Sequence, residues 1–110
     1  MRLTEAIQLL LRWHVSGLPV VDERGLLVGI ITEHDIMNFA FSGDAADTTV
    51  GEVMTRDTVT FPPDTGLETL VNCFATRRIR RVPITEGGRV IGIVSRREIL
   101  REMSRIYSSY

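Results

Sequence analysis

Two short segments of the chain carry residue types that could bind a nucleotide. In each, an aliphatic run ends at a hydroxyl residue and a carboxylate follows three positions later: Thr32 with Asp35, and Ser95 with Glu98. This spacing is typical of a helix N-terminus, where the two side chains accept hydrogen bonds from orphan backbone N–H groups. The same turn could hold a ligand, because free N–H groups attract phosphate and a carboxylate can accept two hydrogen bonds from a ribose diol. The spacing alone leaves both interpretations open, and they are compatible.

These two segments belong to a unit that occurs twice in the chain. Three pairs of segments align, 3–10 with 67–74, 17–22 with 81–86, and 26–36 with 89–99. The last pair places Gly29 on Gly92. Repetition over nearly the whole chain predicts two copies of one structural unit. We assign residues 1–48 to the first copy and 49–110 to the second, which together form one module.

The two copies predict the same order of elements. Each has an amphipathic helix, two strands joined by a glycine turn, and a second helix that begins at Thr32 or Ser95. The first helices are expected at 3–14 and 67–77, and the strands at 18–21, 26–31, 82–85 and 89–94. The second strand of each copy is nearly all aliphatic and is expected to be buried. This alternation predicts an α+β fold.

The second copy has two features that the first copy lacks. A strand is expected at 58–61, before two prolines, and a capping box of Thr49 and Glu52 predicts a short helix before it. The first copy begins directly at its helix, so its opening strand is absent, either because the sequence is a fragment of a longer protein or because this unit does without the strand. A missing strand would leave a sheet edge open to pairing with another chain. Residues 41–48 are interpreted as the linker between the copies.

Composition argues against several classes of function. A net charge of −1 argues against nucleic-acid binding, although all thirteen basic residues are arginine. The lone Cys73, within an apolar helical pattern, is expected to be buried and fits the reducing cytoplasm, where we place the protein. No apolar run is long enough for a membrane span. His14 and His34 lack partners at metal-ligand spacing, and no nucleophile–base pair is evident, so we expect no metal, no required cofactor and no enzymatic activity.

The combined pattern resembles the tandem CBS domain pair, also called the Bateman module. The resemblance rests on the proline-flanked VVD of residues 20–22, the glycine turn, the aliphatic run, and the GIIT-x-x-D of residues 29–35, with the related second copy and the VGEVMT of residues 50–55. It implies two CBS-type β-α-β-β-α repeats packed with pseudo-twofold symmetry, with two clefts that take AMP, ADP, ATP or S-adenosylmethionine. It also implies regulation of a fused or docked partner, and a homodimer formed through the helices that begin at Thr32 and Ser95.

The resemblance also implies which residues bind the ligand, since each cleft of the family uses both repeats. In the first cleft Asp35 would hold the ribose, Thr32 a phosphate or hydroxyl, and Arg80 and Arg81 the phosphates, because guanidinium groups meet phosphate oxygens in pairs. The other residues of this cleft would be Thr55, Thr58, Thr60 and Val82.

The second cleft departs from the family pattern and is expected to be weaker. It would be formed by Ser95 and Glu98 with Ser16, Gly17 and Leu18. Glutamate is one methylene longer than aspartate, and no arginine stands where Arg80 and Arg81 stand in the first cleft. The sequence therefore favours a nucleotide-sensing regulatory module, and the alternative is a structural or dimerisation module without a ligand.

Several other side chains carry no ligand-binding expectation. Arg77 and Arg78 end a predicted helix and are expected on its surface, where cations complement the helix dipole. Trp13, Met37 and Phe39 are expected to pack against the helices that carry them.

Overall fold

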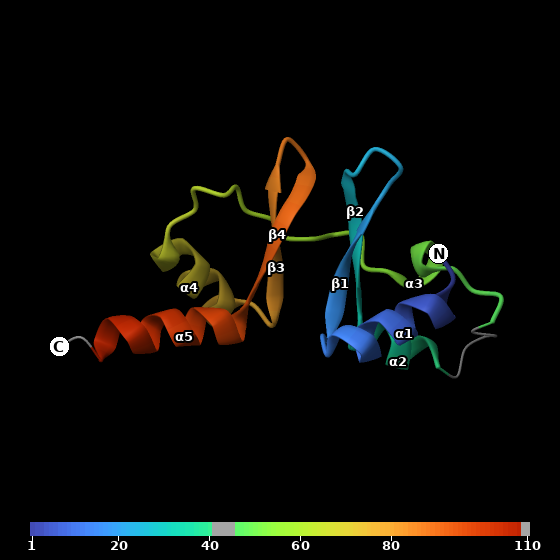
Figure 1. The fold of residues 1–110 in the computed structure, drawn as a ribbon, viewed down its shortest axis with the longest axis horizontal. Coiled ribbons are helices and arrows are strands. Elements are labelled where there is room, and N and C mark those ends of the chain that lie inside the picture. Colours follow the sequence, from blue (N-terminus) through green and yellow to red (C-terminus); the bar gives the residue numbers. More distant parts are fainter. Residues whose placement is uncertain (41–45, 109–110) are drawn as a thin grey trace. The chain divides into compact units, whose positions relative to one another are not determined.

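The structure is a computed structural model that describes residues 1–40 and 46–108. The chain forms two compact units, Met1–Thr58 and Val59–Tyr110, which we call the first and second unit (Figure 1). Each unit contains one antiparallel hairpin with helices packed against it, so the α+β class is confirmed. Residues 49–58, which the repeat assigns to the second copy, pack within the first unit.

The first unit is built around the hairpin of β1 and β2. Its elements are α1 (Leu3–Trp13), β1 (Gly17–Val21), β2 (Leu27–Thr32), α2 (Glu33–Phe39) and α3 (Val50–Val53). The strand register places Gly17 opposite Thr32, with an irregularity after Val20. Apolar residues of α1, β2 and α3 meet in one core around the fully buried Leu3 and the buried Ile31. The core therefore fixes the end of β2, where α2 begins.

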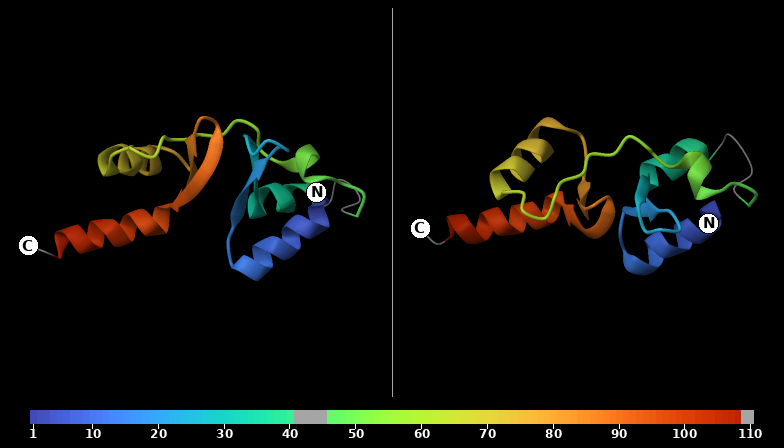
Figure 2. Two further views of the ribbon diagram at one scale, coloured as in Figure 1. Left: turned by 45° about the horizontal axis from the view of Figure 1, so that its top comes forward. Right: turned by 90° about the horizontal axis from the view of Figure 1, so that it is seen from above.

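The second unit repeats the hairpin and its covering helices. Its elements are α4 (Leu67–Thr76), β3 (Arg81–Glu86), β4 (Arg89–Ser95) and α5 (Arg96–Tyr107). The β3–β4 turn contains Gly88 at a φ of 82°, a left-handed conformation that suits glycine. α4 and α5 lie side by side against the hairpin (Figure 2). The prediction for Cys73 is confirmed, because it is buried in the core with Phe74 and Val82.

The predicted opening strand at 58–61 is wrong in extent. Only Phe61 pairs with β3, through N–H donation to the Pro83 carbonyl at 3.3 Å and acceptance from the Thr85 N–H at 2.9 Å. Thr55, three residues before this segment, pairs with β2 in the first unit, and Pro62, directly after the segment, cannot donate a hydrogen bond to extend the ladder. Residues 58–61 therefore make a single bridge to β3 instead of a strand.

Four other local predictions need correction. α3 begins after Thr49, but Thr49 makes no side-chain cap, so the predicted capping box is absent. The expected burial of β4 is wrong, since Ile91 is 54% exposed and lies on a face that the helices of its own unit leave uncovered. Trp13 and Met37 are 65% and 70% exposed, so they do not pack as expected. Phe39 does pack on the core of the first unit.

The predicted linker at 41–48 is only partly described, because residues 41–45 lie outside the described residues. Its last residue, Thr48, is buried and its carbonyl accepts the Leu3 N–H at 2.9 Å. In the described ranges, no helix has both the length and the apolarity needed to cross a bilayer.

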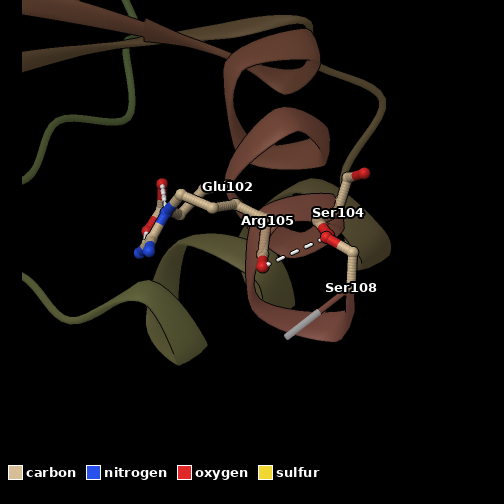
Figure 3. Close-up of polar contacts among 4 residues, drawn as sticks. All are labelled: Glu102, Ser104, Arg105 and Ser108. Carbon is tan, nitrogen blue, oxygen red and sulfur yellow. Dashed lines mark hydrogen bonds and ion pairs between the residues drawn. The ribbon is translucent and has the colours of Figure 1, made fainter. Parts of the chain in front are cut away.

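The last turns of α5 are held by polar contacts of their own (Figure 3). Glu102 and Arg105 form an ion pair, and the hydrogen bond from this guanidinium lowers the pKa of the Glu102 carboxyl. The Ser108 hydroxyl donates to the Ser104 carbonyl at 2.6 Å and to the Arg105 carbonyl at 3.3 Å. A side-chain donor at this position helps to satisfy the carbonyls of the last turn, which a helix end leaves short of backbone partners.

Candidate functional site

Three polar side chains meet where β2 passes into α2, and we call them the Asp35 cluster: Thr32, Asp35 and Thr55. Asp35 Oδ2 accepts hydrogen bonds from the Thr32 N–H at 2.9 Å and from the Thr32 hydroxyl at 3.0 Å. The Asp35 N–H donates to Thr32 Oγ1 at 3.1 Å, which completes the predicted capping box. Asp35 Oδ1 accepts from the Thr55 hydroxyl at 2.9 Å. The carboxylate is thus held in one orientation by both neighbours.

Thr55 reaches this cluster because its backbone is attached to the edge of β2. The Thr55 N–H donates to the Ile30 carbonyl at 2.8 Å, and the Ile30 N–H donates to the Thr55 carbonyl at 2.8 Å. Gly29 allows this close approach, since a Cβ there would lie 2.8 Å from both the Met54 sulfur and the Thr55 oxygen. The family resemblance placed Thr55 and Asp35 in one cleft but did not predict their direct contact. The repeated glycine does not reveal this approach by itself, because a Cβ at the matching Gly92 would meet nothing within 4 Å.

The backbone amides at the start of α2 are largely occupied within the first unit. The Glu33 N–H donates to the Ser16 carbonyl at 2.9 Å, and the N–H groups of Thr32 and Asp35 are bonded within the cluster. α2 is only seven residues long, so its dipole is small. The cluster therefore fits the hydroxyls of a ribose better than it fits a phosphate.

The predicted residues Ser16, Gly17 and Leu18 lie beside this cluster in the first unit. Gly17 is buried and is paired with Thr32 across the hairpin, and Leu18 packs on the core. Their backbone thus positions the Thr32 turn.

The second unit contains the equivalent arrangement at the start of α5. Glu98 Oε1 accepts from the Ser95 N–H at 3.1 Å and from the Ser95 hydroxyl at 3.0 Å, and the Glu98 N–H donates to Ser95 Oγ at 3.1 Å. The second predicted capping box is therefore confirmed. Arg80 and Arg81 lie beside it, because the Arg96 N–H donates to the Arg80 carbonyl at 2.8 Å and Arg81 pairs with Ser95.

The remaining residues predicted for the first cleft differ in how accessible their side chains are to a ligand. Val82 is 0% exposed in the core of the second unit, so a ligand would meet only its main chain. Thr58 and Thr60 are half-buried, in the first and second unit respectively. Arg80 is exposed and Arg81 is half-buried, so at least Arg80 offers its guanidinium to a dissolved anion.

No metal site accompanies these residues in the part of the chain that the structure describes. There, no three side chains among histidine, cysteine, aspartate and glutamate gather closely enough to hold an ion.

A separate apolar groove of about 570 Å³ lies between α1 and α2 in the first unit. Leu11 and Met37 line it and are each 70% exposed, and Ser16 and Glu33 also line it. This much exposed apolar surface on two adjacent helices is typical of a protein contact.

Comparison with known proteins identifies the family. The family model described as the CBS domain matches residues 1–42 and 50–105, and the chain belongs to the CBS domain family. The tandem pair predicted from the repeat is thus confirmed, with a first repeat that opens with a helix.

Curated relatives include both enzymes and a protein named only for its CBS domain. The chain is 37% identical over 98 residues to an inosine-5'-monophosphate dehydrogenase of Methanocaldococcus jannaschii, covering 88% of the chain and 19% of that enzyme. It is 36% identical over 92 residues to the CBS domain-containing protein YhcV of Bacillus subtilis, covering 83% of the chain and 65% of that protein. The chain therefore spans less than two thirds of these relatives.

Two similar solved structures contain adenosine compounds. The CBS domain pair of protein MJ0100, in complex with 5'-methylthioadenosine and S-adenosyl-L-methionine, is 32% identical with a TM-score of 0.85 and covers 96% of this chain and 84% of its own. CBSX2, a CBS-pair protein from Arabidopsis thaliana, in complex with AMP, is 26% identical with a TM-score of 0.85 and covers 97% of this chain and 84% of its own.

Proposed function

We propose that the chain is a regulatory module that binds an adenine nucleotide or adenosyl compound and thereby controls a fused or docked partner. The observation that carries this proposal is the Asp35 carboxylate, half-buried and oriented by Thr32 and Thr55. A fixed carboxylate in the first turn of a helix, directly after a strand, can accept hydrogen bonds from the vicinal hydroxyls of a ribose. The adenosine compounds in the MJ0100 and CBSX2 structures support the same class of ligand.

In this proposal the polar groups of the two repeats have different roles. Asp35 and Thr32 bind the ribose, while Arg80 and Arg81 bind phosphate, for which a guanidinium is suited because it stays charged. The set of Ser95 and Glu98 forms a weaker second site. Binding would act on the partner only if the ligand prefers one arrangement of the repeats, since a ligand shifts an equilibrium by its differential affinity.

We propose that the module releases its ligand chemically unmodified, because the role of the module is sensing and not catalysis. Melting temperature measured against AMP, ADP, ATP, S-adenosylmethionine, GTP and NADH tests the proposal. A ligand at about one hundred times its dissociation constant should add roughly 2.7 kcal/mol, which is several degrees for a domain of this size. A panel in which no adenine compound raises the melting temperature would refute the proposal. Chromatography of the recovered ligand should show it unmodified.

Substitution of Asp35 locates the site. Asp35→Asn keeps the size of the side chain but removes its charge, and it should weaken binding by about 1.5–3 kcal/mol, roughly ten- to a hundredfold. Asp47→Asn is the matched control, because Asp47 is exposed in the same unit and its carboxylate lies outside the Asp35 cluster. Calorimetric titration in which Asp47→Asn and Asp35→Asn behave alike would place the ligand elsewhere.

We also propose that two copies of the module associate through the groove between α1 and α2. The exposed Leu11 and Met37 favour this contact over a solvated surface. Leu11→Glu should give a monomer in sedimentation, whereas Arg12→Glu, one position away and also exposed, should not. The dimerisation module becomes the better description under two conditions. The protein must self-associate, with this association lost in Leu11→Glu but not in Arg12→Glu, and no ligand of the panel may raise its melting temperature.

A further inference from the structure

We propose that Thr55 is an internal competitor of the ligand's ribose and sets the affinity of the Asp35 cluster. In the free protein its hydroxyl occupies Asp35 Oδ1 at 2.9 Å, and it must turn away before both hydroxyls of a diol can donate to that oxygen. This inference rests on the proposed function, because it assumes that the ligand carries a ribose.

The Asp35 carboxylate can accept only a limited number of hydrogen bonds. An ionised carboxylate offers about four lone-pair positions, two on each oxygen. Oδ2 already accepts two hydrogen bonds from Thr32, and Oδ1 accepts one from Thr55. About one position is then left, whereas a diol that donates through both hydroxyls needs two. One of the internal hydrogen bonds must therefore be exchanged for a bond to the ligand.

The bond from Thr55 is the one that can be exchanged at low cost. The two Thr32 bonds belong to the capping box that starts α2, so their loss would fray the helix. Thr55 is exposed, and its backbone is attached to Ile30 by two hydrogen bonds of 2.8 Å. Its hydroxyl can rotate about χ1 while the backbone stays in place. The exchange thus replaces one hydroxyl donor, from the protein, by another from the ribose.

The second unit lacks this competitor within the residues that the structure describes. Glu98 Oε1 takes both capping bonds from Ser95, and no threonine hydroxyl among the described residues joins them as Thr55 joins Asp35. A Cβ added at Gly92, which matches Gly29, would meet no atom within 4 Å, so no described segment approaches there as residues 54–55 approach β2. The competition is therefore a property of the first unit, and it follows from the placement of Thr55.

Thr55→Val tests the inference, because valine keeps the shape of threonine and removes the hydroxyl. It should tighten binding of AMP or S-adenosylmethionine about three- to tenfold, the effect of one ordinary net hydrogen bond. It should leave the affinity for the 2',3'-dideoxy analogue of the same compound unchanged, since that analogue has no diol to compete. Thr4→Val, at an exposed threonine on α1 that lies outside the Asp35 cluster, should change neither affinity.

Calorimetric titration separates the possible failures. If wild type and Thr55→Val both bind but with equal affinity, or if the variant binds more weakly, the competition is refuted while the proposed function stands. An equal gain for both the ribose and dideoxy compounds also refutes it, because a general loosening of the site would then explain the change. If neither protein binds AMP or S-adenosylmethionine, the proposed function fails and this inference fails with it.

Discussion

The close contact at Gly29 allows the loss of stability caused by Gly29→Ala to be estimated from the structure. In Gly29→Ala the added Cβ would lie 2.8 Å from the Thr55 carbonyl oxygen and 2.8 Å from the Met54 sulfur. The methionine side chain can move, but the Thr55 oxygen is main chain and accepts the Ile30 N–H at 2.8 Å. The bridge between residues 54–55 and β2 must therefore shift or break.

The expected loss follows from two opposing effects. Overpacking of a filled site costs about 1–3 kcal/mol. Replacement of glycine by alanine returns about 0.4–1 kcal/mol, because the unfolded chain has less freedom to lose. The free energy of unfolding should fall by about 1.3 kcal/mol, within a range of about 0–2.6 kcal/mol, and at about 4–8 °C per kcal/mol the melting temperature should fall by roughly 5–10 °C.

The matched control is Gly92→Ala at the equivalent position of the second copy. A Cβ there meets nothing within 4 Å, and its φ is not in the left-handed region. This variant should be neutral or more stable by up to about 1 kcal/mol. Urea denaturation of both variants measures the difference between their free energies of unfolding. Equal stability of Gly29→Ala and Gly92→Ala would show that residues 54–55 do not approach β2 as the structure has them.

Two further predictions concern the second unit. Phe74→Ala should reduce the free energy of unfolding by about 3–5 kcal/mol in urea titration, because Phe74 is 7% exposed in the core and alanine leaves a cavity; a loss below about 1 kcal/mol would contradict that packing. Because Arg105 lowers the pKa of the Glu102 carboxyl, their pair stabilises the fold above the ordinary glutamate pKa, and this contribution is lost as the pH falls through the lowered value. Glu102→Gln should therefore melt earlier than wild type at about pH 7, and the difference should shrink as the pH falls into the acid range, whereas a difference that does not shrink would refute the role of the charge.

The sequence predicted well those features that depend on neighbouring residues. Both capping boxes, at Thr32 and at Ser95, form as the hydroxyl and carboxylate spacing indicated. The box at Thr49 does not form, although its spacing is the same. Thr49 is instead bridged to Arg2, and the adjacent Val50 N–H donates to the Met1 carbonyl at 2.9 Å. Pairing with a distant segment decided this position, and no local pattern shows it.

Burial of an aliphatic strand depends likewise on what approaches its edge and faces. β2 and β4 have similar sequences, yet Ile30 is 9% exposed and the matching Ile93 is 36% exposed. The difference in the first unit comes from residues 54–55, which attach to β2 at Ile30. The hydrophobic pattern predicts that these residues form a strand, but it does not predict which segment of the chain packs against that strand.

One segment therefore explains both the partial success of the sequence predictions and the proposed chemistry of the site. Residues 49–58 follow the pattern of the second copy but pack on the first unit, and they bring the Thr55 hydroxyl to Asp35. A duplicated sequence would otherwise give two equivalent carboxylates, one at each hairpin. Because the segment reaches Asp35 within the first unit, Asp35 is oriented from two sides, while Glu98 is oriented by the capping bonds of Ser95. An asymmetry of ligand affinity between the two sites is thus expected from the path of the chain, in addition to the difference between aspartate and glutamate.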